Sequence, residues 1–257
     1  MQRYMIMSRP DENSRRLEEK THKILAENHY ILDKENPEVV FVIGGDGTFL
    51  YAVHQYVQKL QNLKFYGIHT GTLGFYTDYQ EADYDEFMDT FLRGAYMEIS
   101  YPLLCVHVGD NTYHALNEAR IENVTRTQTM NVWLDDVFLE VFRGTGLCVS
   151  TQLGSTAYNR SLGGAVIQEG TNIIQLTEIA GIHHSQYRSL GSPLVMNENI
   201  TVYLQSTDFR GAKLGVDSDI YPIDDLHEII IRKDPEHQVK MLKGRKVSYF
   251  TRLKTLF

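Results

Sequence analysis

Residues 39–50 read VVFVIGGDGTFL, and this stretch decides the fold class of the chain. The apolar run Val39–Ile43 is typical of a buried strand, and it gives way at once to Gly44-Gly45-Asp46-Gly47. Glycines tolerate a left-handed backbone and let a bulky anion approach bare N–H groups. Asp46 is the one side chain in the turn that can hold a cation or accept a proton. We therefore expect a site for phosphate chemistry where this strand ends.

Strand and helix patterns alternate on both sides of this turn. Strands are expected at 4–8 and 64–69, and helices are expected at 12–27, 48–60 and 83–93. Such alternation is typical of a parallel sheet flanked by helices, in which ligands lie beyond the carboxyl ends of the strands. The sequence therefore predicts an N-terminal Rossmann-like α/β domain.

The pattern changes near residue 101, where helical periodicity fades. Short apolar runs are separated by tight turns at 109–111 and 135–136, and further strands are expected at 200–205 and 228–232. These features predict a mainly-β, sandwich-like C-terminal domain. The last twenty residues are basic and are expected to return to the first domain. The expected domains are 1–100 with about 238–257, and 101–237.

The composition excludes several classes of protein. The 257 residues are 42% hydrophobic and 23% charged, which is ordinary for a globular chain with a sizeable core. A net charge of -8 argues against a general nucleic-acid binder, which needs clustered lysine and arginine. No apolar run approaches the roughly 20 residues that span a bilayer, and no export is expected. Cys105 and Cys148 are expected to be buried free thiols, and the cytoplasm is the expected location.

An ordinary strand-end turn is the alternative interpretation of Gly44–Gly47, because turns favour glycine and aspartate. The order strand, glycines, acid, glycine and helix favours a functional site instead. The P-loop pattern Gly-x-x-x-x-Gly-Lys-Ser/Thr is absent, and Gly144-x-Gly146 has Val149 in place of the third glycine of the dinucleotide fingerprint. A P-loop protein or a Rossmann oxidoreductase is therefore disfavoured.

Two polar or aromatic pairs follow other expected strands. Phe75 and Tyr76 come after the turn that contains Gly74, and they either line a flat pocket for a ring or are core aromatics. Asn117 and Glu118 offer an amide beside a carboxylate, which suits ribose hydroxyls or a base edge. Ordinary surface polarity is the alternative for this second pair.

The tract 154–164, GSTAYNRSLGG, is too polar for a core and too varied for a linker. Its hydroxyls and backbone amides suit ribose and phosphate oxygens, and Tyr158 can stack on an adenine. A nucleophilic Ser155 or Ser161 is disfavoured, because the sequence shows neither Gly-x-Ser-x-Gly nor a partnered base. The adjacent His183-His184 are interpreted as surface residues rather than as a metal site.

Together these tracts resemble the NAD kinase family, which transfers a phosphoryl group to the 2′-hydroxyl of the adenosine ribose of NAD. The resemblance covers most of the chain and rests on five motifs in their order and spacing: GGDGTFL at 44–50, HTGTLGF at 69–75, LNE at 116–118, GSTAY at 154–158 and VD at 216–217. Each motif alone is shared with other folds, whereas the five together are specific. The resemblance implies an α/β domain with the glycine turn and a C-terminal β domain with the other tracts.

The same resemblance implies roles for individual residues. Asp46 would be the catalytic carboxylate that acts on the 2′-hydroxyl. The implied phosphate-binding residues are Gly44, Gly45, Gly47 and Thr48. The implied NAD-binding residues are Asp46, Gly47, Phe75, Tyr76, Asn117, Glu118, Arg143, Thr145, Ser155, Thr156, Ala157, Tyr158, Asn159, Arg160, Ser161, Ala180 and Ser218. Arg143 and Ala180 fall where family members touch NAD at a subunit interface.

Three positions depart from the family's pattern. Thr145 stands where relatives commonly have aspartate, and Ser218 stands where they have glycine or histidine. Gln152-Leu153 replace the usual Pro-Ser/Thr before Gly154. Thr145 removes a charge that could meet the nicotinamide part or a neighbouring subunit. We expect these departures to change NAD geometry and affinity rather than the reaction.

The implied activity is the synthesis of NADP from NAD with ATP or inorganic polyphosphate as donor and Mg²⁺ as the metal. Asp46 is either the general base or a Mg²⁺ ligand. A homo-oligomer, dimer or tetramer, is implied, without nucleic-acid or membrane partners. The alternatives are a lipid or diacylglycerol-type kinase, a phosphofructokinase-like enzyme, or a nucleotide-sensing protein without catalysis. The tracts at 117–118 and 154–158 favour a nucleotide over a lipid, and the β second half disfavours a phosphofructokinase.

Overall fold

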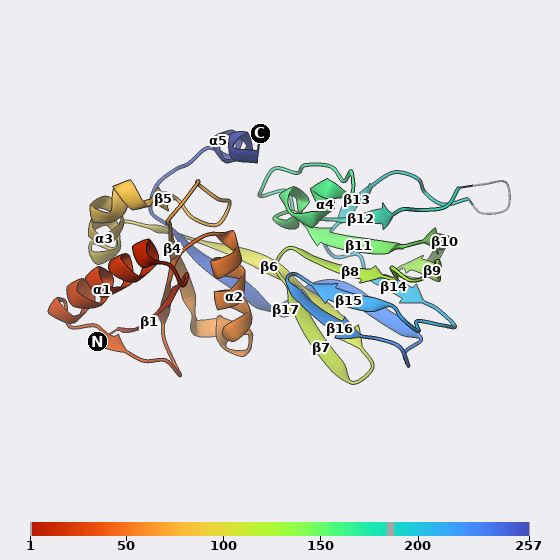
Figure 1. Cartoon of the computed structure of the whole chain (residues 1–257), viewed down its shortest axis with the longest axis horizontal. Coiled ribbons are helices and arrows are strands. Elements are labelled where there is room, and N and C mark those ends of the chain that lie inside the picture. The colour runs from red at the N-terminus through yellow and green to blue at the C-terminus, as the bar shows by residue number, and fades with distance from the viewer. Residues whose placement is uncertain (1, 184–187, 257) are drawn as a thin grey trace. The chain divides into compact units, whose positions relative to one another are not determined.

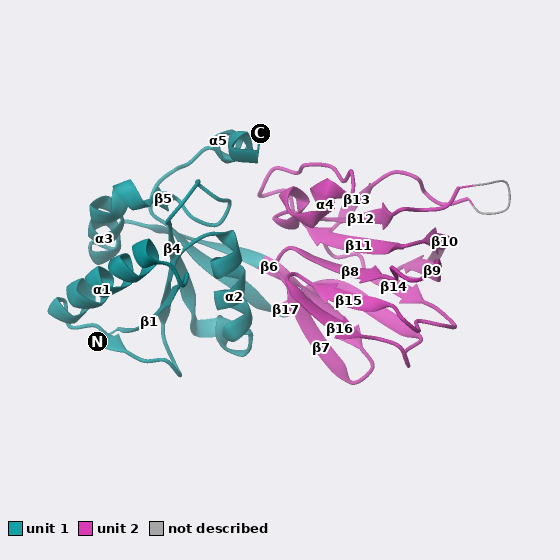
Figure 2. Ribbon diagram, viewed as in Figure 1, with its two compact units in different colours: residues 1–101, 236–257 teal, residues 102–235 magenta. Residues whose placement is uncertain are grey.

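The computed structural model describes residues 2–183 and 188–256, and the chain divides into two compact units (Figure 2). Unit 1 comprises residues 1–101 and 236–257, and unit 2 comprises residues 102–235. Two strands, β6 (Met97–Val108) and β17 (Glu228–Lys243), cross the boundary between the units. His184 lies outside the described residues, whereas His183 is exposed, as expected.

Unit 1 is built on a parallel sheet with the strand order β2-β1-β3-β4-β17, and β5 pairs with β4. The strands are β1 (Arg3–Ser8), β2 (Ile31–Leu32), β3 (Val39–Ile43), β4 (Lys64–His69), β5 (Tyr79–Gln80) and the end of β17. Neighbouring strands in this order pair in parallel, as do β4 and β5. Ser8 pairs with Ile43, and Ile43 pairs with Ile68, so the carboxyl ends of three strands meet at one edge.

Helices cover both faces of this sheet (Figure 1). The helices of unit 1 are α1 (Glu12–Glu27), α2 (Asp46–Gln55), α3 (Tyr84–Leu92) and α5 (Tyr249–Leu253), with the 3₁₀ turns η1 (Val57–Asn62), η2 (Glu81–Asp83) and η4 (Lys254–Leu256), and those that cover the sheet are α1, α2 and α3. On one face, α1 and α3 pack in a core in which the Phe41 and Phe91 rings are 4.7 Å apart. On the other face, Phe49 of α2 packs on Phe65, with 5.6 Å between the ring centroids.

The helix expected at 48–60 is shorter and is divided in two. Helix α2 runs from Asp46 to Gln55, and the 3₁₀ turn η1 follows it. The break is at Tyr56, whose ψ of 17° leaves the helical range and whose hydroxyl donates to the backbone oxygen of Lys34. The break lets Leu60 reach the core with no exposed surface.

Unit 2 is a sandwich of two sheets. One sheet has the order β10-β9-β14-β17, and β6 and β7 extend it beside β17; the other has the order β13-β12-β11-β8-β15-β16. The strands not yet given are β7 (Asn111–Ala115), β8 (Glu118–Glu122), β9 (Gln128–Leu134), β10 (Val137–Gly144), β11 (Gly146–Thr151), β12 (Ile173–Ile179), β13 (Leu194–Asn197), β14 (Val202–Gln205), β15 (Lys213–Val216) and β16 (Asp219–Pro222). A 3₁₀ turn, η3 (Gly154–Thr156), and a short helix, α4 (Tyr158–Ser161), follow β11.

Alternate residues of both sheets fill one core in unit 2. Val106, Val132 and Ile231 come from one sheet, and Ile121 and Val149 come from the other, each fully buried. The period of two explains why short alternating apolar runs formed strands here. The expected α/β plus mainly-β architecture is confirmed. Both cysteines are buried free thiols, as expected. Among the described residues, no helix has the length and apolar character needed to cross a bilayer.

Candidate active site

The glycine turn lies between β3 and α2, at the carboxyl edge of the parallel sheet of unit 1. Gly45 is the N-cap residue of α2, and no side chain caps this helix end. The first N–H groups of a helix have no partner within the helix, so they attract anions. A Cβ on Gly44 would overlap the Thr48 hydroxyl, which keeps this turn tight. The predicted phosphate-binding residues therefore lie together at a helix N-terminus.

Asp46 stands in the first turn of α2 with its carboxylate fixed by the neighbouring loop. The backbone N–H of Phe75 donates to Oδ1 at 3.1 Å and to Oδ2 at 2.9 Å, and that of Tyr76 donates to Oδ1 at 3.2 Å. A Cβ on Gly74 would overlap the same carboxylate. The loop after β4 therefore needs glycine at position 74 so that its amides can reach Asp46.

His69, the last residue of β4, lies against the glycine turn. The backbone N–H of Gly71 donates to Nδ1 at 2.9 Å, so the neutral ring carries its proton on Nε2. Burial lowers the pKa of His69; the nearby Asp46 opposes this shift and Arg9 adds to it. A Cβ on Gly45 would lie 3.2 Å from Nε2, so Nε2–H faces the turn. The ring can donate to an anion held there.

The 74–78 loop is held by two buried cations from the C-terminal part of unit 1. Arg252 donates to the backbone oxygens of Gly74, at 2.8 Å, and Thr77, and it forms an ion pair with Asp78. Lys243 donates to the backbone oxygen of Tyr76 at 3.1 Å. These bonds satisfy carbonyls that point inward, and they fix the loop that positions Asp46.

The two aromatic rings after Gly74 point in different directions. Tyr76 is 5% exposed and stacks on Phe49, with 5.1 Å between the ring centroids, so its ring belongs to the core of unit 1. Phe75 is partly exposed, with its ring 6.2 Å from that of Tyr249 in α5. Of the pair, Phe75 has the ring that is free to border a ligand.

In unit 2, the buried carboxylate of Asp217 organises the turn between β7 and β8. It accepts hydrogen bonds from the backbone N–H groups of Leu116 at 2.8 Å, Asn117 at 2.8 Å and Glu118 at 3.1 Å. Asp217 itself has a left-handed backbone, with φ of 51°, in the tight turn between β15 and β16. The next residue, Ser218, is exposed in this turn.

Glu118 is a buried acid with an unusual environment. It is 4% exposed, and its Oε2 has no hydrogen-bond partner among the described residues. Burial and, secondarily, the charge of Asp217 raise the pKa of Glu118 to about 8, against the opposing effect of Arg120. The backbone N–H of Tyr158 also hydrogen-bonds to this carboxyl. Glu118 can therefore carry a proton near neutral pH and donate it to an acceptor on a ligand.

The tract after β11 packs directly on this turn. The Thr151 hydroxyl donates to the backbone oxygen of Leu116 at 2.7 Å, and a Cβ on Gly154 would overlap the Asn117 backbone. Gln152, one of the departures, accepts hydrogen bonds from the backbone N–H groups of Gly170 and Thr171 at 2.6 and 3.0 Å. In this chain Gln152 therefore holds the 170–171 turn beside the tract.

Residues 155–161 divide into buried anchors and accessible groups. Ser155 has no exposed surface and donates to Gln152 O at 2.7 Å, and buried Asn159 accepts from Thr177 at 2.7 Å. The partly exposed or exposed residues are Thr156, Ala157, Tyr158, Arg160 and Ser161.

The Tyr158 ring is held in a fixed orientation by two partners. The Arg120 guanidinium lies 4.8 Å from the ring centroid, and the hydroxyl donates to Glu122 at 2.6 Å. This bond raises the pKa of Tyr158 to about 12. The opposite face of a ring held in this way is suited to stacking on a base.

Arg143, Thr145 and Ala180 form a separate group. A Cβ on Gly144 would overlap the backbone oxygen of Ala180, so these residues are neighbours. Thr145 directly precedes β11 and Thr151 ends it, and six residues of strand span roughly 20 Å. The structure therefore brings together the tracts 116–118 and 151–158 but leaves this group at the other end of β11.

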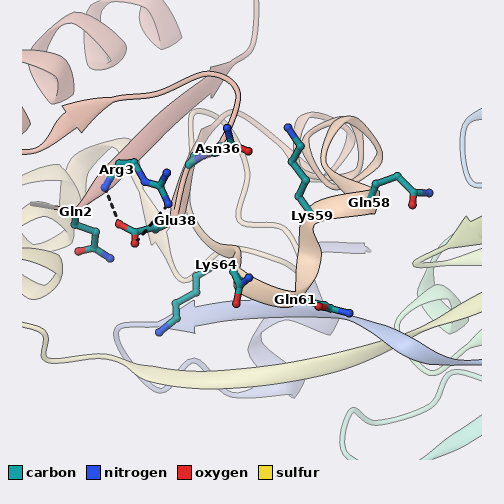
Figure 3. Close-up of a pocket in the computed structure, with 10 residues that line it drawn as sticks. Gln2, Arg3, Asn36, Glu38, Gln58, Lys59, Gln61 and Lys64 are labelled. Atoms are coloured by element: carbon teal, nitrogen blue, oxygen red, sulfur yellow. Dashed lines mark hydrogen bonds and ion pairs between the residues drawn. The ribbon is translucent and has the colours of Figure 1, made fainter.

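A polar hollow of about 830 Å³ lies elsewhere in unit 1 (Figure 3). It is lined by Gln2, Arg3, Asn36, Pro37, Glu38, Gln58, Lys59, Gln61, Asn62 and Lys64. Arg3 and Lys64 begin β1 and β4, so the hollow is at the amino ends of strands. Ligands of parallel sheets bind at the carboxyl ends, and no predicted site residue lines this hollow.

Comparisons with known proteins agree with this geometry. The family model described as ATP-NAD kinase N-terminal domain matches residues 5–96, and the one described as ATP-NAD kinase C-terminal domain matches residues 116–243. The NAD kinase of Pediococcus pentosaceus is 36% identical over 262 residues, which cover 99% of this chain and 97% of the relative. The chain belongs to the NAD kinase family. NAD kinase 1 of Listeria monocytogenes is 42% identical over 221 residues, 84% of each chain.

Solved structures of NAD and NADH kinases have the same fold. Yeast NADH kinase in complex with NADH matches with a TM-score of 0.83 at 18% identity, over 100% of this chain and 87% of that chain. An NAD kinase from Archaeoglobus fulgidus in complex with ATP matches with a TM-score of 0.76 at 23% identity, over 99% and 97%. The predicted family is confirmed, and a lipid kinase is not favoured.

Four residues that shape the candidate site were not predicted as site residues: His69, Arg120, Asp217 and Arg252. His69 and Asp217 belong to two of the motifs on which the family resemblance rests. The sequence therefore identified the motifs but not the roles of these two side chains. Arg120 and Arg252 had no signal in spacing or composition. Their roles come from contacts with residues that are distant in sequence, such as Asp78 for Arg252.

Proposed function

We propose that this protein phosphorylates the 2′-hydroxyl of the adenosine ribose of NAD and uses ATP as the phosphoryl donor. The observation that carries the proposal is the Asp46 carboxylate, held by the Phe75 and Tyr76 amides beside the glycine turn at the start of α2. Membership of the NAD kinase family supports both substrates. Inorganic polyphosphate is a second donor that the same anion site would accept.

In this proposal the residues of unit 1 align the donor and the acceptor. The N–H groups at the start of α2 and Nε2–H of His69 hold phosphate oxygens. Asp46 orients the 2′-hydroxyl and accepts its proton as the new P–O bond forms and the bond from the transferred phosphorus to the departing ADP oxygen breaks. Such general-base help contributes about 10²- to 10⁴-fold to the rate. Because the amides fix the carboxylate before the substrate binds, little reorganisation is needed at the moment of transfer.

Mg²⁺ is part of the proposal, and the glycine turn offers this ion one carboxylate, that of Asp46. Asp46 is the only carboxylate of the glycine turn, and its Oδ2 accepts a hydrogen bond from the Phe75 N–H at 2.9 Å, which leaves a lone pair. Magnesium is commonly held by one or two carboxylates, with waters and substrate phosphates completing the shell. In the alternative in which Asp46 is the metal ligand rather than the general base, Asp46 and the donor phosphates would hold the ion, which when bound neutralises charge on the transferring phosphoryl group.

The residues of unit 2 are proposed to bind NAD. Tyr158 supplies a ring that Arg120 and Glu122 already hold in place. Asn117 and Glu118 present an amide and a protonated carboxyl, which suit ribose hydroxyls or a base edge. Arg143, Thr145 and Ala180 stand apart from this group, and we propose that they meet NAD at a subunit interface.

A homo-oligomer and a cytoplasmic location complete the proposal. Strand β10 is an edge strand, and its residues Val137, Phe138 and Val141 are 62%, 46% and 41% exposed. Exposed apolar side chains on a sheet edge favour association with another chain. The two buried free thiols are typical of a reducing compartment.

The test is NADP formation from NAD, ATP and Mg²⁺, read by an NADP-specific dehydrogenase. Asp46→Asn should lower kcat by about 10²- to 10⁴-fold and leave NAD affinity, measured by calorimetry, within about twofold. Asp85→Asn, at an exposed acid on α3, is the matched control and should keep the wild-type rate. A wild-type protein that binds NAD but makes no NADP would replace the proposal with a nucleotide sensor.

A further inference from the structure

One face of the strands β6, β7 and β17 carries a cluster of metal-ligating side chains in unit 2. Leu104 and Val106 of β6 face the core of the sandwich, so Cys105 and His107 project from the opposite face. Cys105 pairs with His114 across β6 and β7. Asp234 comes from β17, which pairs with β6. The cluster belongs to no part of the proposed NAD or ATP site.

The ligand atoms of this cluster lie close together. One ligand atom from each of Cys105, His114 and Asp234 lies within 4.8 Å of the other two. His114 Nδ1 lies 2.6 Å from Asp234 Oδ2. Cys105 Sγ is 3.3 Å from His107 Nε2. Bonds of 2.0–2.3 Å to a tetrahedral zinc ion imply roughly 3.3–3.8 Å between ligand atoms. Modest side-chain shifts would therefore accommodate an ion.

His107 is oriented to complete the set. Its Nδ1 is 3.0 Å from the Thr112 hydroxyl, and its Nε2 is 3.2 Å from Arg232, which can only donate. The neutral ring therefore carries its proton on Nδ1, and its Nε2 lone pair accepts from Arg232, which has to move aside before this nitrogen can bind an ion. A hydrogen bond from the non-ligating nitrogen is the usual second contact of a zinc-bound histidine. His107 also lines a hollow of about 230 Å³, through which an ion could reach the cluster.

The burial of the cluster and the kinds of ligand atom in it favour zinc. Cys105 is 4% exposed and Asp234 is 2% exposed, so a thiol, an imidazole and a carboxylate share a dry environment. Buried charges are normally paired or coordinate a metal. A sulfur, nitrogen and oxygen donor set suits zinc, whereas magnesium and calcium require oxygen ligands.

We propose that this protein binds a structural Zn²⁺ ion through Cys105, His114 and Asp234, with His107 as the fourth ligand. The ion would tie three strands together close to where the chain leaves unit 2, since Asp234 is one residue from its last residue, Pro235. Binding requires loss of the thiol proton from Cys105 and forms four metal–ligand bonds without any redox step. The site is independent of the proposed kinase activity, so its failure would not affect that proposal.

The first experiment measures zinc in full-length protein purified without a metal-affinity tag. Elemental analysis after dialysis should find close to one zinc per chain. Cys105→Ser and Asp234→Asn should each lower the zinc content at least tenfold. Chelation of the wild type should lower its melting temperature, and added Zn²⁺ should restore it. A zinc-free wild type that takes up no zinc would overturn the proposal in favour of a hydrogen-bonded His114–Asp234 pair.

The second experiment uses Co²⁺, and its main readout comes from the wild type alone. Cobalt added to the zinc-free wild type should give the intense visible bands of a tetrahedral ion and a thiolate charge-transfer band. Cys148→Ser is the matched control, because Cys148 is the only other thiol and lies on β11. It should keep both signals, and His107→Gln should shift the visible bands. Octahedral bands without charge transfer, or loss of the signal in Cys148→Ser, would contradict the assignment.

Discussion

Both oxygens of the Asp46 carboxylate accept a hydrogen bond from the backbone N–H of Phe75, at 3.1 Å for Oδ1 and 2.9 Å for Oδ2. Two adjacent strand-end loops of one parallel sheet are thereby locked together at the proposed point of phosphoryl transfer. This connection requires the backbone of the loop to lie close to the Asp46 carboxylate. Arg252 stabilises the same loop by donating to the backbone oxygen of Gly74. Both features can be altered separately.

Gly74→Ala should impair catalysis without unfolding the protein. The added Cβ would overlap the Asp46 carboxylate and push it out of line with the 2′-hydroxyl. Misplacement of a catalytic group by 1 Å can cost about 10²-fold in rate, so a fall in kcat of this order is expected. Gly71→Ala is the matched control, because its Cβ would make an ordinary contact 3.5 Å from His69. Equal kcat values for the two variants would refute this view of Gly74.

Arg252→Met should destabilise unit 1. The variant leaves buried Asp78 with Lys243, 3.4 Å away, as its remaining cation and removes the donor to Gly74 O. Breaking a buried ion pair from one side typically costs about 3–5 kcal/mol, and the remaining cation should keep the loss near about 3 kcal/mol. Urea unfolding measures it. Arg93→Met, which breaks an exposed ion pair with Asp89, should change stability by less than about 1 kcal/mol.

The elements of unit 1 were predictable because local patterns determined them. The apolar run Val39–Ile43 ends in glycines, and the helix expected at 12–27 is α1 with the same bounds. The break at Tyr56 was not predictable, since the apolar spacing continues through it and a contact with Lys34 decides it. Periodicity reports which face of an element is buried, but it does not report a tertiary contact that ends the element.

The candidate site could be predicted only in part, for a related reason. Turn glycines and the acid among them are local signals, so the sequence alone predicts Asp46 as a candidate. Whether Tyr76 faces a ligand or the core depends on Phe49, which is 27 positions earlier in the chain. Asp217 lies about one hundred positions from the residues whose N–H groups donate to its carboxylate, and no local pattern connects it with them. Side-chain roles set by long-range contacts became visible only with the fold.

The free energy of unfolding should fall as the pH rises between about 5 and 8 because of Glu118. Burial raises the pKa of this carboxyl from 4.5 to about 8, so in that window the folded chain holds a proton that the unfolded chain has released. The unfolded state then binds fewer protons, and stability declines by up to about 1.4 kcal/mol per pH unit.

Glu118→Gln, which resembles the protonated acid, should remove this contribution to the slope. Urea unfolding of the wild type and the variant at several pH values gives the comparison. Glu19→Gln, at an exposed residue of α1, is the control and should keep the wild-type slope. Parallel curves for wild type and Glu118→Gln would mean that Glu118 is ionised throughout this range.

Asp217→Asn should weaken NAD binding more than it slows phosphoryl transfer. The wild-type carboxylate accepts hydrogen bonds from three backbone N–H groups. An asparagine has one acceptor oxygen, and its NH₂ group would face N–H groups that also donate. Loss of charge-assisted hydrogen bonds that position Asn117 and Glu118 should cost about 1.5–3 kcal/mol, which corresponds to a rise in KM for NAD of at least about tenfold. The kcat should stay within about threefold, because Asp46 and its loop belong to unit 1.

Asp219→Asn, at an exposed residue two positions after Asp217, is the control and should leave both kcat and KM unchanged. A fall in kcat with an unchanged KM would instead place Asp217 in the chemical step.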